Sequence, residues 1–300
     1  MRICRRLPVG VVLALVAAGC GSSSSSSTSS AGAGKPAASG HGKVSVLYAG
    51  SLVNMMEHDL GPAFAGATHY SYEGVGAGST ELVAQIKGKV RVGDVFISAS
   101  PKANDGLEGT ANGDWVSWYA TFAKAPLVIG YNPQSSFAAQ FRTKPWYKVI
   151  TEPGIRVGVT DPKLDPKGKL TVQAMDEAAA KLGLPELKAG VSRFTVFPEE
   201  DLVGRLEAGQ LDAGFFYSNE AKEQHIPTVP ITPVAASAMY TVTILEGAPN
   251  PSGAEAFVSY LLGPTGRATL QRHGLTVLSP TVTGSAGAVP AGLRSLLGAG

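Results

Sequence analysis

Two serines of this sequence stand where an anion can be bound. Ser51, in the stretch YAGSL, follows the apolar run Val44–Tyr48 and precedes a helix-like pattern. Ser79, in GAGSTELV, also follows a glycine and precedes an amphipathic stretch. At such strand-to-helix turns, backbone N–H groups, a hydroxyl and the helix dipole can hold an anion without a full positive charge. A serine at this place is also a common helix N-cap, so spacing alone leaves both interpretations open.

The other motifs of phosphate, metal and ester chemistry are missing. The stretch GVGAGST departs from the dinucleotide fingerprint because Ser79 takes the place of its third glycine, and no Gly-Lys-Ser/Thr follows. No Gly-x-Ser-x-Gly nucleophile elbow occurs. The histidines are widely separated and have no His-x-x-x-His spacing, which favours surface or linker positions over a zinc site. They stand at positions 41, 58, 69, 225 and 273.

From residue 43 onward, short apolar runs alternate with amphipathic stretches. GDVFISAS, APLVIGYN, IRVGVTDP and LDAGFFYS read as buried strands, and STELVAQIKGK, KLTVQAMDEAAAKLG and PEEDLVGRLEAG read as helices. Residues 253–274 read as one helix, or as two that are broken at Gly263-Pro264. This alternation predicts an α/β architecture with mainly parallel sheets, in which a ligand lies at the carboxyl ends of the strands beside helix N-termini.

The first residues predict export from the cytoplasm. MRICRRLPVGVVLALVAAGC combines a positive start, an apolar run over about 7–18 and small residues before Cys20, and it is too short for a membrane span. The ending VAAGC resembles a bacterial lipoprotein signal (residues 1–19) in which Cys20 is lipidated, although Ala17 replaces the usual leucine. An ordinary cleavable signal with an incidental cysteine is the alternative. Residues 20–42 are rich in Ser, Gly and Ala, which predicts a flexible tether.

Charge and cysteine usage narrow the class further. The chain of 300 residues carries a net charge of +2, but removing the three arginines of the leader leaves 22 basic and 23 acidic residues, or −1. A body with this balance has no basic face to offer a nucleic acid. Both cysteines lie within the first 20 residues, so the body can form no disulfide. We expect a soluble body held outside the cell membrane.

Several stretches resemble one family of binding proteins. They occur, in order, as in the molybdate/tungstate-binding proteins of ABC importers, and they cover the chain from about residue 43 to 280. The resemblance is strongest to the branch that includes the archaeal-type tungstate-binding proteins. The stretches are YAGSL, GAGST, GDVFISA, WYATFAKAPLVIGYNP, WYKVITEPGIRVGVTDPKLDPKG and LEAGQLDAGFFYSNEAKEQ.

The resemblance implies a two-lobed, type II periplasmic-binding-protein fold, in which two α/β lobes joined by two hinge strands close on the ligand. We expect lobe 1 to comprise residues 43–124 and 236–300, and lobe 2 to comprise residues 125–235. The hinge is expected near Lys124–Leu127 and Pro233–Met239.

The resemblance also implies a set of ligand-binding residues. Two serines, a tyrosine, an acidic residue 18 positions before that tyrosine, and an acidic residue followed by a backbone N–H donor match the family's anion site. In this branch the two carboxylates can coordinate Mo or W itself and make the bound oxyanion six-coordinate. The matching positions are Ser51, Ser79, Tyr217, Glu199, Asp165 and the N–H of Lys167.

The carboxylates of this set also have ordinary structural interpretations. A carboxylate beside a dianion is repelled unless it binds the metal or is protonated. Glu199 and Glu200 are what the first turn of a helix prefers, and Asp165-Pro166 is what a turn prefers. Lys167 stands where the family often has a small residue, so its side chain either supplements the site or faces solvent.

We therefore expect a monomeric, lipid-anchored, extracytoplasmic binding protein that delivers molybdate and/or tungstate to an ABC permease. It would be no enzyme and would need no cofactor. One alternative is sulfate, which cannot expand its coordination and which both carboxylates would oppose. Another is an ester hydrolase, which needs a base near Ser51 or Ser79, and the sequence marks none. A structural or adhesive lipoprotein would bind no small ligand. The sequence does not distinguish molybdate from tungstate.

Overall fold

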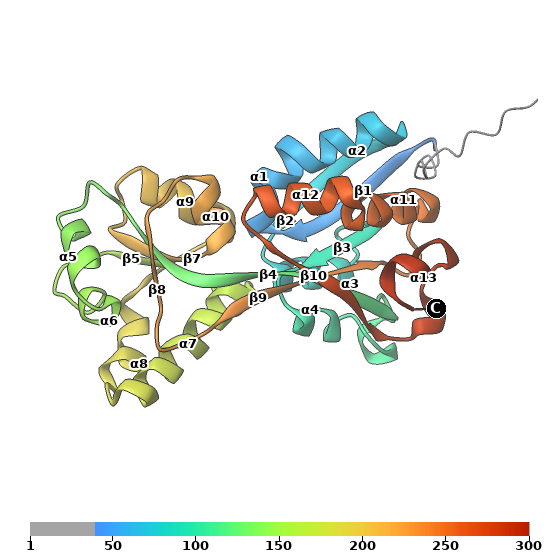
Figure 1. The fold of residues 1–300 in the computed structure, drawn as a ribbon. Helices are drawn as coiled ribbons and strands as arrows, with labels where there is room; N and C mark the ends of the chain where they lie inside the picture. Colours follow the sequence, from blue (N-terminus) through green and yellow to red (C-terminus); the bar gives the residue numbers. More distant parts are fainter. Residues whose placement is uncertain (1–39, 300) are drawn as a thin grey trace, which may run out of the picture. The chain divides into compact units, whose positions relative to one another are not determined.

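One long strand joins the two sheets of the protein. The computed structural model describes residues 40–299. In it, β4 (Trp118–Tyr131) has different partners along its two halves, and we call the part built on its first half lobe 1 and the part built on its second half lobe 2 (Figure 1). The partners of the first half are β9 (Ser237–Ile244) and β10 (Thr276–Gly284), and those of the second half are β7 (Ala213–Tyr217) and β8 (Thr228–Pro230).

Lobe 1 is an α/β layer on the strand order β2-β1-β3-β9-β4. Strand β1 (Lys43–Ala49) runs parallel to β2 (Ser71–Ala77) and to β3 (Val95–Ser98). β1 and β3 are buried along almost their whole length, which explains their continuous apolar sequences. The helices of lobe 1 are η1 (Gly50–Leu52), α1 (Val53–Met55), η2 (Met56–Leu60), α2 (Gly61–Thr68), α3 (Ser79–Lys87), α4 (Pro101–Asp105), η3 (Thr110–Asn112), α11 (Pro251–Leu262), α12 (Pro264–Arg272), η5 (Ala286–Ala288) and α13 (Ala291–Leu297).

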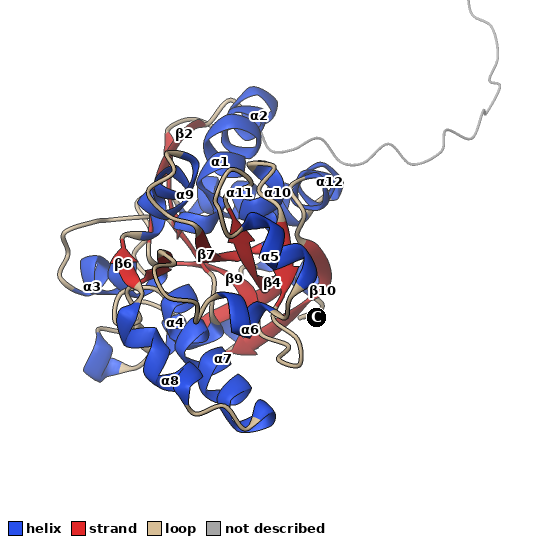
Figure 2. Ribbon diagram, turned by 90° about the vertical axis from the view of Figure 1, so that its left-hand side faces the viewer, coloured by secondary structure: helices blue, strands red, loops and turns tan. Residues whose placement is uncertain are grey.

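Lobe 2 repeats this construction on the order β4-β7-β5-β6. Strand β5 (Val157–Thr160) runs parallel to β6 (Thr195–Phe197) and to β7. Figure 2 views the protein from the lobe 2 side and shows helices around these strands. The helices are α5 (Ala138–Thr143), α6 (Trp146–Val149), α7 (Pro166–Leu182), α8 (Glu186–Gly190), η4 (Val191–Arg193), α9 (Glu199–Glu207) and α10 (Ser218–Glu223).

The sheets are mixed, so the prediction of mainly parallel sheets is only partly right. Every strand pair that involves β4 or β9 is antiparallel, while β1, β2 and β3 pair in parallel, as do β5, β6 and β7. The reason lies in the connections. The chain passes from lobe 1 to lobe 2 along β4 and returns along β9, so these two neighbouring strands run in opposite directions.

The ends of α7 follow from its sequence and matter for the site. Asp165 is the N-cap, and its Oδ1 accepts hydrogen bonds from the N–H groups of Lys167 and, at 3.3 Å, Gly168. Pro166 occupies the first turn, where its missing N–H costs no hydrogen bond. Gly183 ends the helix with a φ of 68°, the left-handed conformation that a glycine adopts readily at a helix C-cap. The N-cap therefore places the Asp165 carboxylate at the carboxyl end of β5.

Some predicted elements differ in detail. The helix-like pattern that follows Ser51 is a 3-10 turn, a short α-helix, a π turn and then α2. The stretch 253–274 forms two helices, because Gly263 adopts extended backbone and Pro264 begins α12. Helix α10 was not predicted at all, because its six residues are too few to show a helical period.

No helix within residues 40–299 has the length and apolar character that a membrane crossing needs. The predicted signal of residues 1–19, the lipidated Cys20 and nearly all of the tether lie outside the described residues.

Candidate functional site

Ser51 is held by contacts far away in the sequence. It is buried in η1, whose cap residue is Ala49, and no side chain caps that turn. Its Oγ lies 3.0 Å from the hydroxyl of Tyr240, and its carbonyl oxygen accepts a 2.9 Å hydrogen bond from Nδ2 of Asn219. The helix-cap interpretation of Ser51 is therefore wrong.

Ser79 is not a cap either. The cap residue of α3 is Gly78, and Ser79 is the first residue of the helix, fully buried. Its Oγ accepts a 3.1 Å hydrogen bond from the N–H of Ala99 at the end of β3. Because the oxygen acts as acceptor here, its own O–H stays available to donate.

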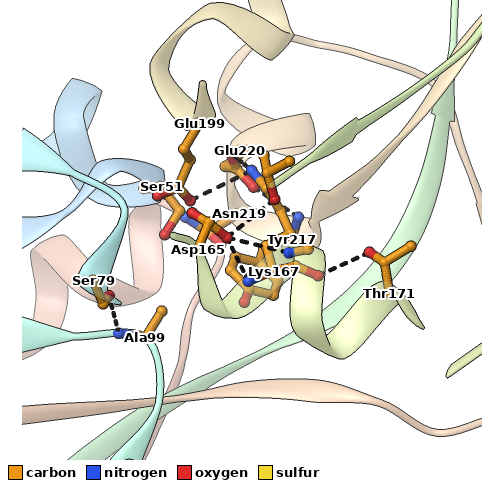
Figure 3. A network of polar contacts seen from close by, with 12 residues as sticks. Ser51, Ser79, Ala99, Asp165, Lys167, Thr171, Glu199, Tyr217, Asn219 and Glu220 are labelled. Carbon is orange, nitrogen blue, oxygen red and sulfur yellow. Dashed lines mark hydrogen bonds and ion pairs between the residues drawn. The ribbon is translucent and has the colours of Figure 1, made fainter. Parts of the chain in front are cut away.

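Lobe 2 contributes four buried polar side chains. Asp165, Lys167, Glu199 and Tyr217 come from the start of α7, the start of α9 and the end of β7, and each is at most 5% exposed. Figure 3 shows the carboxylates of Asp165 and Glu199 close to Ser51, with Ser79 on the lobe 1 side. The structure thus brings together the residues that the sequence analysis singled out from both lobes.

Several polar atoms of this cluster have no hydrogen-bond partner other than one another. They are Oδ2 of Asp165, both Oε atoms of Glu199 and the hydroxyl of Tyr217. Oε1 of Glu199 has one ion pair, at 3.4 Å from Nζ of Lys167. Buried polar groups are nearly always hydrogen-bonded, and one left unpaired costs about 1–3 kcal/mol. A group of such atoms around one point indicates a binding site for a polar ligand.

Burial and neighbouring charges shift the pKa values of three side chains in the site. Burial, with the nearby Asp165 carboxylate, raises the pKa of Glu199 well above its usual value, and Lys167 offsets this only in part. Burial and the charge of Asp165 also raise the pKa of the Tyr217 hydroxyl, which therefore stays a hydrogen-bond donor. Burial alone would lower the pKa of Lys167, but the neighbouring carboxylates outweigh it and leave that pKa above the usual value.

The backbone N–H of Lys167, a ligand donor according to the resemblance, is hydrogen-bonded to the Asp165 carboxylate. The Lys167 side chain is fully buried, so the alternative that it faces solvent is wrong. Its Nζ donates a 2.7 Å hydrogen bond to Glu220, in addition to the ion pair with Glu199.

Two glycines let the lobes approach at the site. A Cβ on Gly50 would lie 2.7 Å from Oε2 of Glu199, and one on Gly78 would lie 2.6 Å from the carbonyl oxygen of Leu164. That carbonyl also accepts a 3.0 Å hydrogen bond from the N–H of Glu81. The turn before Asp165 therefore packs directly on the N-terminus of α3.

Cavities extend from the cluster between the lobes. One of about 190 Å³ is lined by Ser51, Glu199 and Glu220 among others. Another of about 420 Å³ is lined by Ala99, Pro166 and Tyr217 among others. The two cavities leave room for a ligand beside the cluster.

The polar groups of this site are suited to binding a polar ligand. Within residues 40–299 no group of three or more His, Cys, Asp or Glu side chains is arranged to hold a metal ion. The hydroxyl of Ser51 is hydrogen-bonded to Tyr240, and that of Ser79 to the N–H of Ala99. Neither of these partners is a general base. Hydroxyl donors and two carboxylates converge instead.

Three contributors were missed by the sequence analysis. Asn219 and Glu220 begin α10 directly after β7, at the same kind of strand-to-helix turn as Ser51, and this shared position was a usable signal. Tyr240, in β9, contacts Ser51 across 189 positions, and no local pattern indicates it.

The prediction of surface or linker histidines is wrong for His273. Its side chain is 12% exposed and lies between two carboxylates. Nδ1 is 2.7 Å from Glu223 of α10 in lobe 2, and Nε2 is 2.5 Å from Asp59 in lobe 1. The residue therefore joins the two lobes outside the cluster.

Comparison with known proteins agrees with this geometry. The profile of the family described as bacterial extracellular solute-binding protein matches residues 44–276. The chain belongs to this family. The resemblance inferred from the sequence is confirmed, and the family consists of binding proteins for transport rather than enzymes.

Individual proteins with similar sequences include other solute-binding proteins. An uncharacterized solute-binding protein of Petrotoga mobilis is 28% identical over 240 residues, which cover 68% of this chain and 74% of that protein. The molybdate/tungstate-binding protein WtpA of Thermococcus kodakarensis is 24% identical over 237 residues, which cover 61% of this chain and 66% of that protein.

A solved structure supports the fold. The periplasmic molybdate-binding protein of Azotobacter vinelandii superposes with a TM-score of 0.63 at 19% identity, over 78% of this chain and 99% of that one. At this identity the likeness shows the fold alone. The predicted two-lobed α/β fold of periplasmic binding proteins is confirmed.

Proposed function

We propose that this protein binds molybdate and/or tungstate between its lobes and delivers the oxyanion to an ABC permease. The observation that carries the proposal is the set of buried, unpaired oxygen atoms of Asp165, Glu199 and Tyr217, next to Ser51 where the lobes meet. The names of the relatives point to the same class of ligand.

The donors and acceptors of the cluster suit such an ion. The hydroxyls of Ser51, Ser79 and Tyr217 would donate to its oxo groups, and none of them needs a positive charge to do so. The free oxygen atoms of Asp165 and Glu199 would bind the metal centre, because high-valent Mo and W accept further oxygen ligands. Sulfur in sulfate does not, so sulfate would meet two carboxylates with no bond to offset the repulsion.

Capture and release would follow from closure of the lobes. We place lobe 1 at residues 43–124 and 236–300, lobe 2 at 125–235, and the hinges near Lys124–Leu127 and Pro233–Met239. This division is supported by the change of β4 partners after Pro126, where pairing passes from β9 to β7. Opening about these hinges would separate Ser51 from Glu199 and free the ion for the permease.

The proposed binder acts as a monomer on the outer face of the cell membrane, anchored through a lipid on Cys20. The family's extracellular placement supports the location, and the VAAGC stretch supports the anchor. Fractionation of cells fed a labelled fatty acid tests it. The wild type should carry the label in the membrane fraction, and Cys20→Ser should carry none. Unlabelled, soluble wild-type protein would exclude the anchor.

Calorimetric titration of residues 21–300 with molybdate, tungstate, sulfate and phosphate at neutral pH tests the ligand. We expect tight binding of the first two and weak binding of the others. Glu199→Ala should then lose affinity for molybdate and tungstate. Flat traces for all four oxyanions would refute the proposal, and preference for sulfate would replace it with the sulfate alternative.

A further inference from the structure

A lysine lies behind the carboxylates of the site, where it contacts them without reaching solvent. Lys167 is fully buried at the N-terminal turn of α7. We propose that Lys167 is a positioning residue, which holds the Glu199 carboxylate in place and compensates its charge so that the site can present two carboxylates to an oxyanion. This inference rests on the proposed function and deepens it.

The ammonium group of Lys167 contacts carboxylates and aromatic rings. Nζ of Lys167 lies 2.7 Å from Oε1 of Glu220 and 3.4 Å from Oε1 of Glu199. It also lies 5.5 Å from the ring centre of Tyr217 and 5.9 Å from that of Phe216, within cation–π range. The charge is thus enclosed by two carboxylates and two aromatic faces, which fixes where it can act.

The carboxylates offset the cost of burying this lysine. A cation near a helix N-terminus opposes the helix dipole, and a buried ammonium is costly unless it is paired. Besides Glu199 and Glu220, the buried Asp165 carboxylate also acts on this cation. The lysine therefore offsets part of the negative charge that an incoming dianion would meet, and so lowers the repulsion that opposes binding.

Glu220 fixes the position of the Lys167 ammonium group. Its Oε1 accepts from Lys167, and its Oε2 accepts a 2.7 Å hydrogen bond from the N–H of Tyr217. The pair therefore ties the start of α7 to the start of α10, which Tyr217 precedes and Asn219 belongs to. The same ammonium group also forms the ion pair with Glu199 on α9. The N-terminal ends of α7, α9 and α10 are therefore held together through Lys167.

A double-mutant cycle tests the role. We would titrate wild type, Lys167→Met, Glu199→Gln and the double variant with tungstate, and record the X-ray absorption spectrum of bound tungsten. Lys167→Met should lower the affinity at least tenfold, and its spectrum should change in the same way as that of Glu199→Gln. In the Glu199→Gln background the same change should cost less than threefold. Lys181→Met, at the exposed far end of α7, is the matched control and should stay within twofold.

Equal losses in both backgrounds, or a Lys167→Met spectrum like that of the wild type, would overturn the inference. Wild type that binds no oxyanion would overturn the proposed function and this inference with it, whereas wild-type binding that Lys167→Met leaves unchanged would overturn the inference alone.

A second variant covers the case in which Lys167→Met does not fold. Residues 21–300 contain no cysteine, so Lys167→Cys can be alkylated in denaturant at that position alone and then refolded. Aminoethylation rebuilds a lysine-like ammonium and should restore affinity and spectrum, whereas hydroxyethylation, which adds a neutral group of similar size, should not. Equal behaviour of the two products would overturn the inference.

Discussion

The side-chain amide of Asn219 in lobe 2 donates a 2.9 Å hydrogen bond to the carbonyl oxygen of Ser51 in lobe 1. The two residues are 168 positions apart, and each stands just after a strand and at the start of a helix. The bond joins the helix N-termini that face each other across the site. Closure of the lobes is therefore coupled to the turn after β1, which carries the proposed ligand donor Ser51.

Replacing Asn219 by alanine should shorten the life of the closed complex. Asn219 is fully buried, so its loss leaves the Ser51 carbonyl without this donor, at a cost of about 1–3 kcal/mol, or roughly 5- to 150-fold in affinity. We expect the loss mainly in the dissociation rate, measured by stopped flow with tungstate. Asn132→Ala, which removes a bond within lobe 2, is the control. A change confined to the association rate would contradict this interpretation.

Adding a methyl group at the lobe contact should block closure. Gly78→Ala would place a Cβ 2.6 Å from the backbone oxygen of Leu164, and Gly50→Ala would place one 2.7 Å from a side-chain atom, Oε2 of Glu199, which yields more readily than backbone. Gly78→Ala should therefore reduce affinity more than Gly50→Ala. X-ray scattering with saturating tungstate should show compaction of the wild type and little of Gly78→Ala.

Gly66→Ala on α2 is the matched control, because a Cβ there meets no atom within 4 Å. In a helix interior this change should leave binding intact and raise stability by about 0.5–1 kcal/mol. Compaction of the Gly78 variant to the wild-type radius would show that the lobes can close without this glycine.

The local pattern around the site was predictable, but its contacts were not. Ser51 and Ser79 were found because a glycine and serine between an apolar run and an amphipathic stretch mark a strand-to-helix turn. Their partners were not found, since Ala99 approaches Ser79 only through the pairing of β1 with β2 and β3, and Tyr240 approaches Ser51 only through the further pairing of β3 with β9. The cap interpretation failed because tertiary contacts supply these hydroxyls with partners.

Lys167 shows the same limit for charge. For a lysine between Pro166 and Gly168 in a turn-like stretch, the sequence fits a solvated side chain as well as a side chain that supplements the site. Its burial depends on Glu220, 53 positions away, and on Glu199. His273 was misassigned for a similar reason, because its two carboxylate partners come from separate lobes. Family resemblance could identify the acidic pair, but only the fold reveals which cation accompanies it.

His273 should strengthen the closed form from outside the site. Its ring nitrogens face Glu223 in lobe 2 and Asp59 in lobe 1 at 2.7 and 2.5 Å. A ring that donates to both carboxylates at once would carry a positive charge, and salt would weaken such a contact. His273→Gln should lower tungstate affinity several-fold at low ionic strength, and the gap to wild type should narrow in 1 M salt, because Asp59 is partly exposed. His225→Gln, at an exposed position, is the control, and a gap that does not depend on salt would argue against an electrostatic contact.

The Arg156–Asp212 pair should make the stability of lobe 2 depend on pH. Asp212 is buried before β7, and its Oδ2 accepts from the N–H and Nε of Arg156 at 2.8 and 3.0 Å. Burial alone would raise the pKa of Asp212, but the hydrogen bonds from Arg156 and Ser135 outweigh it and hold that pKa below its usual value. A carboxyl whose pKa is lower in the folded protein stabilises it fully above the unfolded pKa, about 3.9. This stabilisation is lost as the pH falls through the folded value.

Asp212→Asn should therefore reduce the free energy of unfolding at pH 7 and lose its disadvantage progressively below about pH 4. Urea unfolding of both proteins between pH 2.5 and 7 measures the difference. Asp176→Asn, whose carboxylate is 44% exposed in a long contact with Lys188, should show little difference at any of these pH values. A deficit of Asp212→Asn that stays constant down to pH 2.5 would mean that Asp212 stabilises lobe 2 through its shape and hydrogen bonds rather than through its charge.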